Sequence, residues 1–168
     1  MDTKALHMMS YGMYIVCSKK GDKINGQSTN SVIQVSSEPP IISVCINKGN
    51  LTHEYIEDSK VFTVSILSQD TPLKIIGGFG FKSGRDVDKF EGVDYKLGET
   101  GAPIVLDSVL ACLEAGVIGS IDVGTHTIFI GELVGAEVIA KGEPMTYAYY
   151  HTVKRGTTPV TAPSYHKD

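Results

Sequence analysis

The stretch Val109–Ile139, VLACLEAGVIGSIDVGTHTIFIGELVGAEVI, determines what kind of fold this chain adopts. It contains two long runs of apolar and β-branched residues, at 109–118 and 127–139, separated by a polar, glycine-containing segment at 120–125. Runs of this composition, bounded by such a segment, are typical of paired β-strands. We therefore predict a long strand at 109–118, a connection at 120–125 and a long partner strand at 127–139.

Shorter strands precede this pair. The predicted strands are 11–18, 32–35, 41–46 and 62–66, each an apolar or alternating run. The dipeptide Asn25-Gly26 is typical of tight turns, so the polar segment 25–31 is predicted to connect two strands. Ser37-Glu38-Pro39-Pro40 is predicted to break the chain before 41–46.

Short helices are predicted between the strands. The segment 52–59 has helix-compatible spacing, with Asn50 or Thr52 as its N-cap. Thr71-Pro72 reads as a cap followed by proline at the first helical position. The predicted apolar face of that helix is Leu73, Ile76 and Phe79, and its end falls in the glycine-rich segment 77–84. Further short helical segments are predicted at 86–90 and 145–150.

The chain of 168 residues fits one mainly β domain with inserted short helices. We predict that residues 1–156 form this domain and that residues 157–168 form an extended or wrapping tail, because Pro159, Pro163 and polar residues follow Gly156. Closing the sheet into a barrel is an economical way to remove its edges.

Charge and composition exclude several classes of partner. The net charge is −4, so the chain lacks the basic surface expected of a protein that binds nucleic acid or anionic lipid. No basic-then-apolar leader and no apolar run of bilayer length is present, and the three cysteines form no C-x-x-C pair. We therefore expect a soluble cytoplasmic protein with reduced thiols. The five histidines lack metal-ligand spacing, so no metal site is predicted.

Four polar clusters are candidate sites, because the familiar motifs of hydrolases, metallopeptidases and phosphate loops are missing from the sequence. Amides and hydroxyls in 25–31 can meet the polar edge of a flat heterocycle. The segment 47–52 precedes a predicted helix, whose N-terminus attracts phosphate. The segment 82–85 and Lys89 bring three cations together. The fourth cluster, 124–131, places His126 at the start of a long strand.

Each cluster also has a plain structural interpretation. Taken alone, 25–31 is more typical of a solvated loop, 82–85 of a solvated basic loop and His126 of a hydrogen-bonded structural histidine. The segment 47–52 is equally typical of ordinary helix capping. Spacing alone leaves these alternatives open.

Together the four clusters, in this order, resemble the flavin reductase-like family of FMN-binding split barrels. The segments that carry the resemblance are Asn25–Asn30 with Ser36–Pro40, Ile46–Thr52, Phe81–Arg85 with Asp88–Phe90, and Gly124–Glu132. Within the family the chain is most similar to flavoredoxin and to the flavin domain of high-molecular-weight rubredoxins, a subgroup supported by Met145–His151 and Lys154–Gly156. The similarity extends over nearly the whole chain.

The resemblance implies a six-stranded Greek-key split β-barrel, paired as a homodimer with FMN near the interface. It implies that the isoalloxazine lies along Asn25, Gln27, Ser28, Thr29, Asn30, Ser31 and Val32. The phosphate and ribityl chain would be held by Asn47, Lys48, Asn50, Thr52, Lys82, Ser83 and Lys89. His126 would position the flavin and the nicotinamide, and the tail would cover a flavin. Many relatives carry Gly-Asp-His where this chain has Gly124-Thr125-His126, which leaves the hydrogen-bond partner of His126 open.

The expected activity is hydride transfer from NADH or NADPH to FMN, followed by electron transfer to a flavin or a redox protein of the rubredoxin or diiron-flavoprotein type. Three alternatives compete with it. One is an electron-transfer flavoprotein reduced by a protein partner, and another is a non-enzymatic barrel that binds some other small molecule. A third is a split barrel that binds heme or oxidises pyridoxamine phosphate, which the context of His126 fits less well.

Overall fold

A computed structural model describes residues 2–165 of the chain. Its main sheet has seven antiparallel strands in the order β2-β1-β5-β8-β9-β4-β3. These strands are β1 (Tyr14–Lys20), β2 (Lys23–Thr29), β3 (Val32–Ser37), β4 (Pro40–Asn47), β5 (Val61–Leu67), β8 (Val109–Asp122) and β9 (His126–Val138). A separate two-stranded sheet pairs β6 (Tyr95–Leu97) with β7 (Pro103–Val105).

The sheet curls into a barrel that is open along one seam. Its two edge strands, β2 and β3, are consecutive in the chain, and only Asn30 and Ser31 connect them. This short connection brings the two edges of the sheet together without pairing them. The prediction of a mainly β split barrel is confirmed.

The seventh strand is where the sequence prediction was wrong. Asn25-Gly26 forms no turn but lies inside β2, where Gly26 pairs with Cys17 and Asn25 with Ser18 of β1. A Cβ on Gly26 would lie 2.5 Å from Cys17 Sγ, so the glycine is needed for close packing of side chains rather than for a turn. The main sheet therefore has seven strands instead of six, and the predicted loop at 25–31 is mostly strand.

The long hairpin of β8 and β9 is confirmed and extends beyond the prediction. β8 continues to Asp122, so the connection is 123–125 rather than 120–125, and Gly124 takes the positive φ of +86° that this tight turn requires. Two bulges, between Glu114 and Ala115 and between Val117 and Gly119, bend the hairpin around the barrel.

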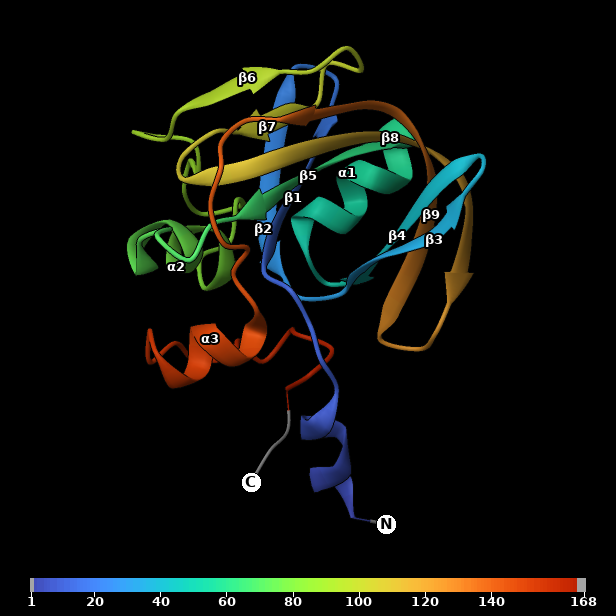
Figure 1. The fold of residues 1–168 in the computed structure, drawn as a ribbon. Coiled ribbons are helices and arrows are strands. Elements are labelled where there is room, and N and C mark those ends of the chain that lie inside the picture. Colours follow the sequence, from blue (N-terminus) through green and yellow to red (C-terminus); the bar gives the residue numbers. More distant parts are fainter. Residues whose placement is uncertain (1, 166–168) are drawn as a thin grey trace.

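Within residues 2–165, four helices interrupt or flank the strands (Figure 1). They are η1 (Thr3–Met8), α1 (Leu51–Ser59), α2 (Leu73–Gly80) and α3 (Tyr147–Thr152). The predicted segment 86–90 forms turns rather than a helix. No helix among residues 2–165 is both long and apolar enough to cross a bilayer.

The start of α2 differs from the prediction. Pro72 occupies the N-cap position, and the Thr71 hydroxyl donates to the carbonyl of Ser108 instead of capping the helix. Ile76 and Phe79 are buried, as the apolar face predicted, whereas Leu73 is 45% exposed. The helix extends through the first glycines of the predicted terminating segment and ends at Gly80.

Two apolar clusters form the core. One fills the barrel, where Val16, Val44, Phe62 and Phe129 are completely buried and Ile56 of α1 packs among them. The other lies between the sheet, α2 and α3 and includes Phe79, Phe90, Met145 and Tyr150. Burial of these side chains from water is the main stabilisation of the domain. Both helices next to the candidate site, α1 and α2, are fixed in place by this packing.

Candidate functional site

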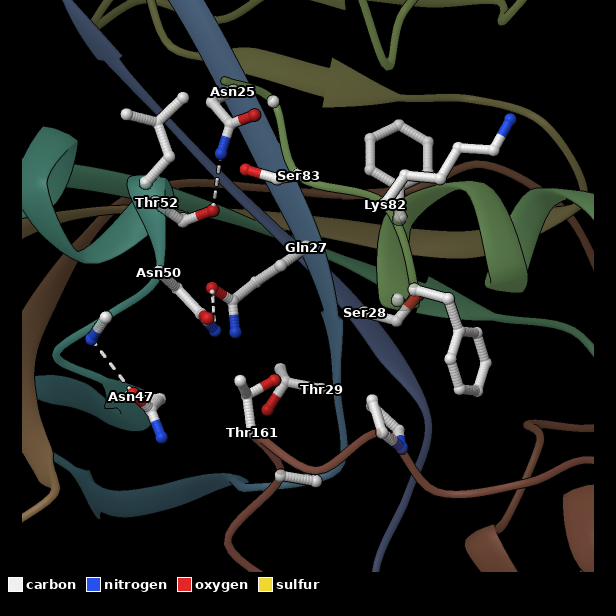
Figure 2. A pocket seen from close by; sticks show the side chains of 18 of the residues that line it. Asn25, Gln27, Ser28, Thr29, Asn47, Asn50, Thr52, Lys82, Ser83 and Thr161 are labelled. Atoms are coloured by element: carbon white, nitrogen blue, oxygen red, sulfur yellow. Dashed lines mark hydrogen bonds between the residues drawn. The ribbon is translucent and has the colours of Figure 1, made fainter. Parts of the chain in front are cut away.

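A cavity of about 230 Å³ lies where β2, the end of β4, the start of α1, the end of α2 and the C-terminal segment meet (Figure 2). Ten of the residues expected at the cofactor line it: Asn25, Gln27, Ser28, Thr29, Asn47, Asn50, Thr52, Lys82, Ser83 and Lys89. The fold thus brings three of the four predicted clusters to one place. Their convergence could not be derived from their spacing in the sequence.

Five expected residues do not line this cavity. Asn30 lines two neighbouring cavities and Val32 lines one of them. Ser31 does not line the site cavity. Lys48 points away to an ion pair with Asp122 across the hairpin end. That pair, with the Gly124 N–H donor, lowers the pKa of the Asp122 carboxyl. His126 does not line the cavity itself, but it pairs with Asn47 across β4 and β9 and hydrogen-bonds the Thr161 carbonyl, and both of these residues line it.

Strand β2 and helix α1 form one polar wall of the cavity. The Asn25 amide donates to Thr52 Oγ1 over 2.8 Å, and both side chains are buried. The Asn50 amide donates to Gln27 Oε1 over 3.0 Å. Asn25, Gln27 and Thr29 alternate along β2, so their side chains share the face toward α1. Figure 2 shows these amides directed toward the start of α1.

The N-terminus of α1 is open to the cavity. Asn50 stands at the N-cap position, but its side chain bonds Gln27 and makes no cap hydrogen bond. Leu51 and Thr52, the first two residues of the helix, both line the cavity. Backbone N–H groups at this end have no intrahelical acceptor and carry partial positive charge. The start of α1 therefore presents backbone donors to the cavity, and an anion site at 47–52 stays a prediction.

Lys89 supplies a buried positive charge. Its Nζ donates to the carbonyls of Gly26 (2.9 Å) and Phe79 (3.0 Å), which leaves one of the three ammonium donors unassigned. Burial lowers the pKa of Lys89 to about 8, since desolvation disfavours the charged form. Burial also raises the pKa of the neighbouring Cys17 thiol to about 12.

His126 is fixed by hydrogen bonds on both ring nitrogens. Nδ1 lies 2.8 Å from the Thr125 hydroxyl and Nε2 lies 3.1 Å from the Thr161 carbonyl. The partner of His126 that the sequence left open is therefore Thr125, together with the C-terminal segment, while Asp122 bonds Lys48. The imidazole itself is buried.

Sequence reasoning missed the apolar and glycine parts of the cavity. The missed lining residues are Cys45, Gly49, Leu51, Phe79, Gly80, Phe81 and Gly84. Pro159, Thr161, Ala162 and Pro163 also line the cavity and belong to the tail that was expected to cover a flavin. Gly84 had a usable signal, because a glycine between Ser83 and Arg85 marks a close approach: its Cβ would lie 2.0 Å from Asn25 Oδ1. The apolar residues gave no such signal, because only the fold decides which of them faces a cavity.

Comparisons with known proteins agree with this geometry. Residues 6–158 match the model of the flavin reductase like domain. Among curated proteins, the chain is 58% identical over 165 residues to the high molecular weight rubredoxin of Moorella thermoacetica, covering 98% of this chain and 72% of that protein. It is 47% identical to the ferric-chelate reductase (NAD(P)H) of Archaeoglobus fulgidus, with 98% of each chain covered.

Solved structures share the fold. The NADH:FAD oxidoreductase SgcE6 of Streptomyces globisporus superposes with a TM-score of 0.77 at 30% identity, covering 84% of this chain and 83% of that chain. Flavoredoxin from Methanosarcina acetivorans superposes with a TM-score of 0.72 at 25% identity, covering 82% and 75%. With a family match over most of its length and close relatives over nearly all of it, the chain belongs to the flavin reductase-like family.

Proposed function

We propose that this protein is an FMN-containing oxidoreductase that takes hydride from NADH or NADPH and passes electrons to a flavin or to a redox protein. The observation that carries the proposal is the convergence of ten expected cofactor residues on one cavity. The names of the relatives support it, since they include a ferric-chelate reductase (NAD(P)H) and an NADH-dependent FAD reductase.

The chemistry of the donors fits FMN. At one end of the cavity are the groups that suit a phosphate: the open N-terminus of α1, the Ser83 hydroxyl and the buried ammonium of Lys89. At the other end, Gln27, Ser28 and Thr29 offer both donors and acceptors for the polar edge of a flat ring. Hydroxyls and amides between the two ends suit a polyhydroxyl chain.

When bound, FMN supplies the redox chemistry, because it takes hydride from the reduced nicotinamide and releases two electrons to an acceptor. The chain's own residues bind and orient. Lys89 and the N-terminus of α1 hold the negative end, while the Asn25–Thr52 and Asn50–Gln27 hydrogen bonds keep β2 and α1 at a fixed separation. His126, at the start of β9, would help to position the nicotinamide. The geometry requires no side chain as an obligatory acid or base.

An anaerobic spectrum tests this function. Purified protein loaded with FMN should lose its flavin absorption band when NADH or NADPH is added. If neither nucleotide removes the band, the reductase is rejected and an electron-transfer flavoprotein is favoured. Reduced ferredoxin should then bleach the flavin. Failure to bind FMN at all would favour a barrel that holds a different small molecule.

A protein electron acceptor is a second part of the proposal. The relative named high molecular weight rubredoxin is longer than the matched region, since the chain covers 72% of it. We propose a separate partner of the rubredoxin or diiron-flavoprotein type. Mixing the reduced protein with rubredoxin in a stopped-flow instrument should give faster flavin reoxidation than free FMN gives, and equal or slower reoxidation would make free flavin the acceptor.

The outer face of the barrel supports a homodimer. Ser43 of β4 pairs with Ile33 of β3 on one side and with Ile130 of β9 on the other. Ile128 of β9 lies on the same face and pairs with Ile121 of β8. Ile33 is 62% exposed and Ile121 is 52% exposed, so an apolar surface stands uncovered. Light scattering should give a dimer mass, which Ile33→Asp should reduce and Val138→Asp, at an exposed strand end, should not. A monomeric wild-type protein would contradict this pairing.

Two further expectations remain proposals. We propose that residues 1–156 are the FMN-binding unit and that the tail 157–168 covers the flavin, supported by four tail residues at the cavity; residues 166–168 lie outside the described part. We also propose a cytoplasmic location, supported by three free cysteines. Cell fractionation tests the location, and crosslinking of the tail to a photoreactive flavin tests the cover.

A further inference from the structure

The segment 157–165, called here the strap, closes one side of the cavity. Pro159, Thr161, Ala162 and Pro163 line the cavity together with β2 and α1. Figure 2 shows Thr161 at the end of the cavity away from Asn25 and Ser83. The strap follows α3, and in Figure 1 it is the red segment between α3 and the C-terminus.

The strap uses the hydrogen-bonding capacity of His126. A carbonyl oxygen can only accept, so Nε2 of His126 must carry the proton that it shares with the Thr161 carbonyl. In the neutral ring Nδ1 then accepts from the Thr125 hydroxyl. With both nitrogens engaged, His126 has no donor or acceptor left for a nicotinamide. The strap in this position and a ligand held by His126 exclude each other.

With the strap in place, the cavity leaves no room for a nicotinamide in addition to FMN. Its volume is about 230 Å³, whereas sites for small molecules and cofactors measure roughly 300–1,000 Å³. Strand β2 and helices α1 and α2 form other parts of the wall, and their core side chains such as Ile56 and Phe79 are completely buried. The wall segments without such packing are the strap and the exposed turn 81–84, so extra volume comes from these segments.

The strap is held by polar contacts and little apolar burial. No residue from 157 to 165 is fully buried, and Val160 is 72% exposed. Besides the Thr161–His126 bond, its attachments include hydrogen bonds from Tyr150 Oη to the Thr157 carbonyl (2.9 Å) and from Asn30 Nδ2 to Ser164 Oγ (2.7 Å). Ser164 Oγ also donates to Tyr147 Oη (3.2 Å), and Thr158 Oγ1 bonds both Tyr147 Oη and His151 Nε2 (3.3 Å for His151). Segments with few buried apolar contacts open at low free-energy cost.

We infer that the strap is a gate for the nicotinamide: it closes the cavity by hydrogen bonding to His126 and must leave before His126 can hold the reduced nucleotide. The inference rests on the proposed function and adds a conformational step to it. The apparent association constant for the nucleotide equals its intrinsic value multiplied by the fraction of molecules in which the strap is open. A largely closed strap therefore weakens nucleotide binding.

A reversible crosslink tests the gate. In the double variant Asn30→Cys, Ser164→Cys, an oxidised pair ties the strap to the end of β2, and thiol titration verifies closure. After FMN loading, flavin reduction by NADH should be at least about tenfold slower in the oxidised form than in the same protein after disulfide reduction and removal of the reductant. Photochemical reduction with EDTA, which needs no nicotinamide, should proceed equally in both forms.

A second variant loosens the strap and keeps the test independent of the crosslink. Thr158→Val with Ser164→Ala removes the side-chain attachments to Tyr147, His151 and Asn30. The KM for the nucleotide should fall by about threefold or more, because the open state is populated more of the time. An unchanged or higher KM, or equal NADH rates in the locked and unlocked protein, would overturn the gate.

The outcomes separate the gate from the function on which it rests. One outcome is that photoreduction succeeds but neither nucleotide reduces FMN in the wild-type, loosened or unlocked protein. That outcome rejects the reductase itself. If wild-type protein is reduced and the locked form reacts at the same rate, the reductase stands and the gate is rejected.

Discussion

The side-chain amide of Asn25 in β2 donates a 2.8 Å hydrogen bond to the hydroxyl of Thr52 in the first turn of α1, and both groups are buried. This bond joins β2, the strand that the sequence did not predict, to the end of α1 that faces the cavity. It fixes how far the polar wall of the site stands from the open N-terminus of α1.

Replacing Thr52 by valine should destabilise the protein and weaken FMN binding. Valine has the same shape but no hydroxyl, so the Asn25 amide loses its acceptor in a buried place, at a cost of about 1–3 kcal/mol. Urea unfolding measures the loss, and flavin fluorescence titration measures affinity. Thr52→Ser, which keeps the hydroxyl, is the matched control. Equal stability and equal FMN affinity in the two variants would show that the Asn25–Thr52 bond contributes to neither.

FMN affinity should fall as the pH rises through about 8. Burial lowers the pKa of Lys89 to about 8, so the ammonium that faces the cavity is lost above that pH. An anionic ligand raises this pKa, and binding near pH 8 should therefore take up a proton. Calorimetry in two buffers of different ionisation enthalpy detects the uptake. In Lys89→Arg, whose charge does not titrate in this range, the proton uptake should vanish. Uptake that persists in this variant would show that a group other than Lys89 takes up the proton.

The same lysine should affect stability in the opposite direction. Because its folded pKa lies below the unfolded value of about 10.4, the unfolded chain binds more protons between pH 8 and 10.4. The Lys89 contribution to stability thus improves as the pH rises through this window and is lost as the pH falls through about 8. Lys89→Met should flatten this part of the stability–pH profile without FMN; a profile that matches wild type would remove Lys89 as the cause.

Gly84→Ala should abolish or strongly weaken FMN binding. A Cβ there would lie 2.0 Å from Asn25 Oδ1 and 3.2 Å from a Leu51 methyl carbon, so the loop carrying Lys82 and Ser83 must move away from β2 and α1. Gly78→Ala in α2 is the control, since nothing lies within 4 Å of its Cβ position. Affinities measured by fluorescence should separate the two variants, and wild-type affinity in Gly84→Ala would place the flavin elsewhere.

Cys45 should be the cysteine that FMN protects from alkylation. It is half-buried and lines the cavity, whereas Cys17 and Cys112 are buried away from it. Burial raises the pKa of the Cys45 thiol, so labelling by N-ethylmaleimide is expected to be slow but measurable by mass spectrometry. Bound FMN should slow labelling at Cys45 several-fold. Unaltered labelling with saturating FMN would argue against the cavity as the flavin site.

Periodicity and composition predicted six of the seven strands of the main sheet, because runs such as 109–118 and 127–139 match the pleat of a strand directly. Strand β2 was not predicted, because the dipeptide Asn25-Gly26 has the local preference of a turn. In the folded protein, pairing of Asn25 with Ser18 and packing of Gly26 against Cys17 outweigh that preference.

The sequence by itself determined the chemical types at the site: amides and hydroxyls at 25–31, a helix start at 47–52 and cations near Lys82 and Lys89. The tertiary structure alone decided which of them meet, because cavity walls come from elements far apart in the chain. It turned Lys48 outward to Asp122, buried Lys89 against two carbonyls, and brought Thr161 across 35 residues to His126. Such contacts depend on how the barrel closes, and local preferences carry no information about that closure.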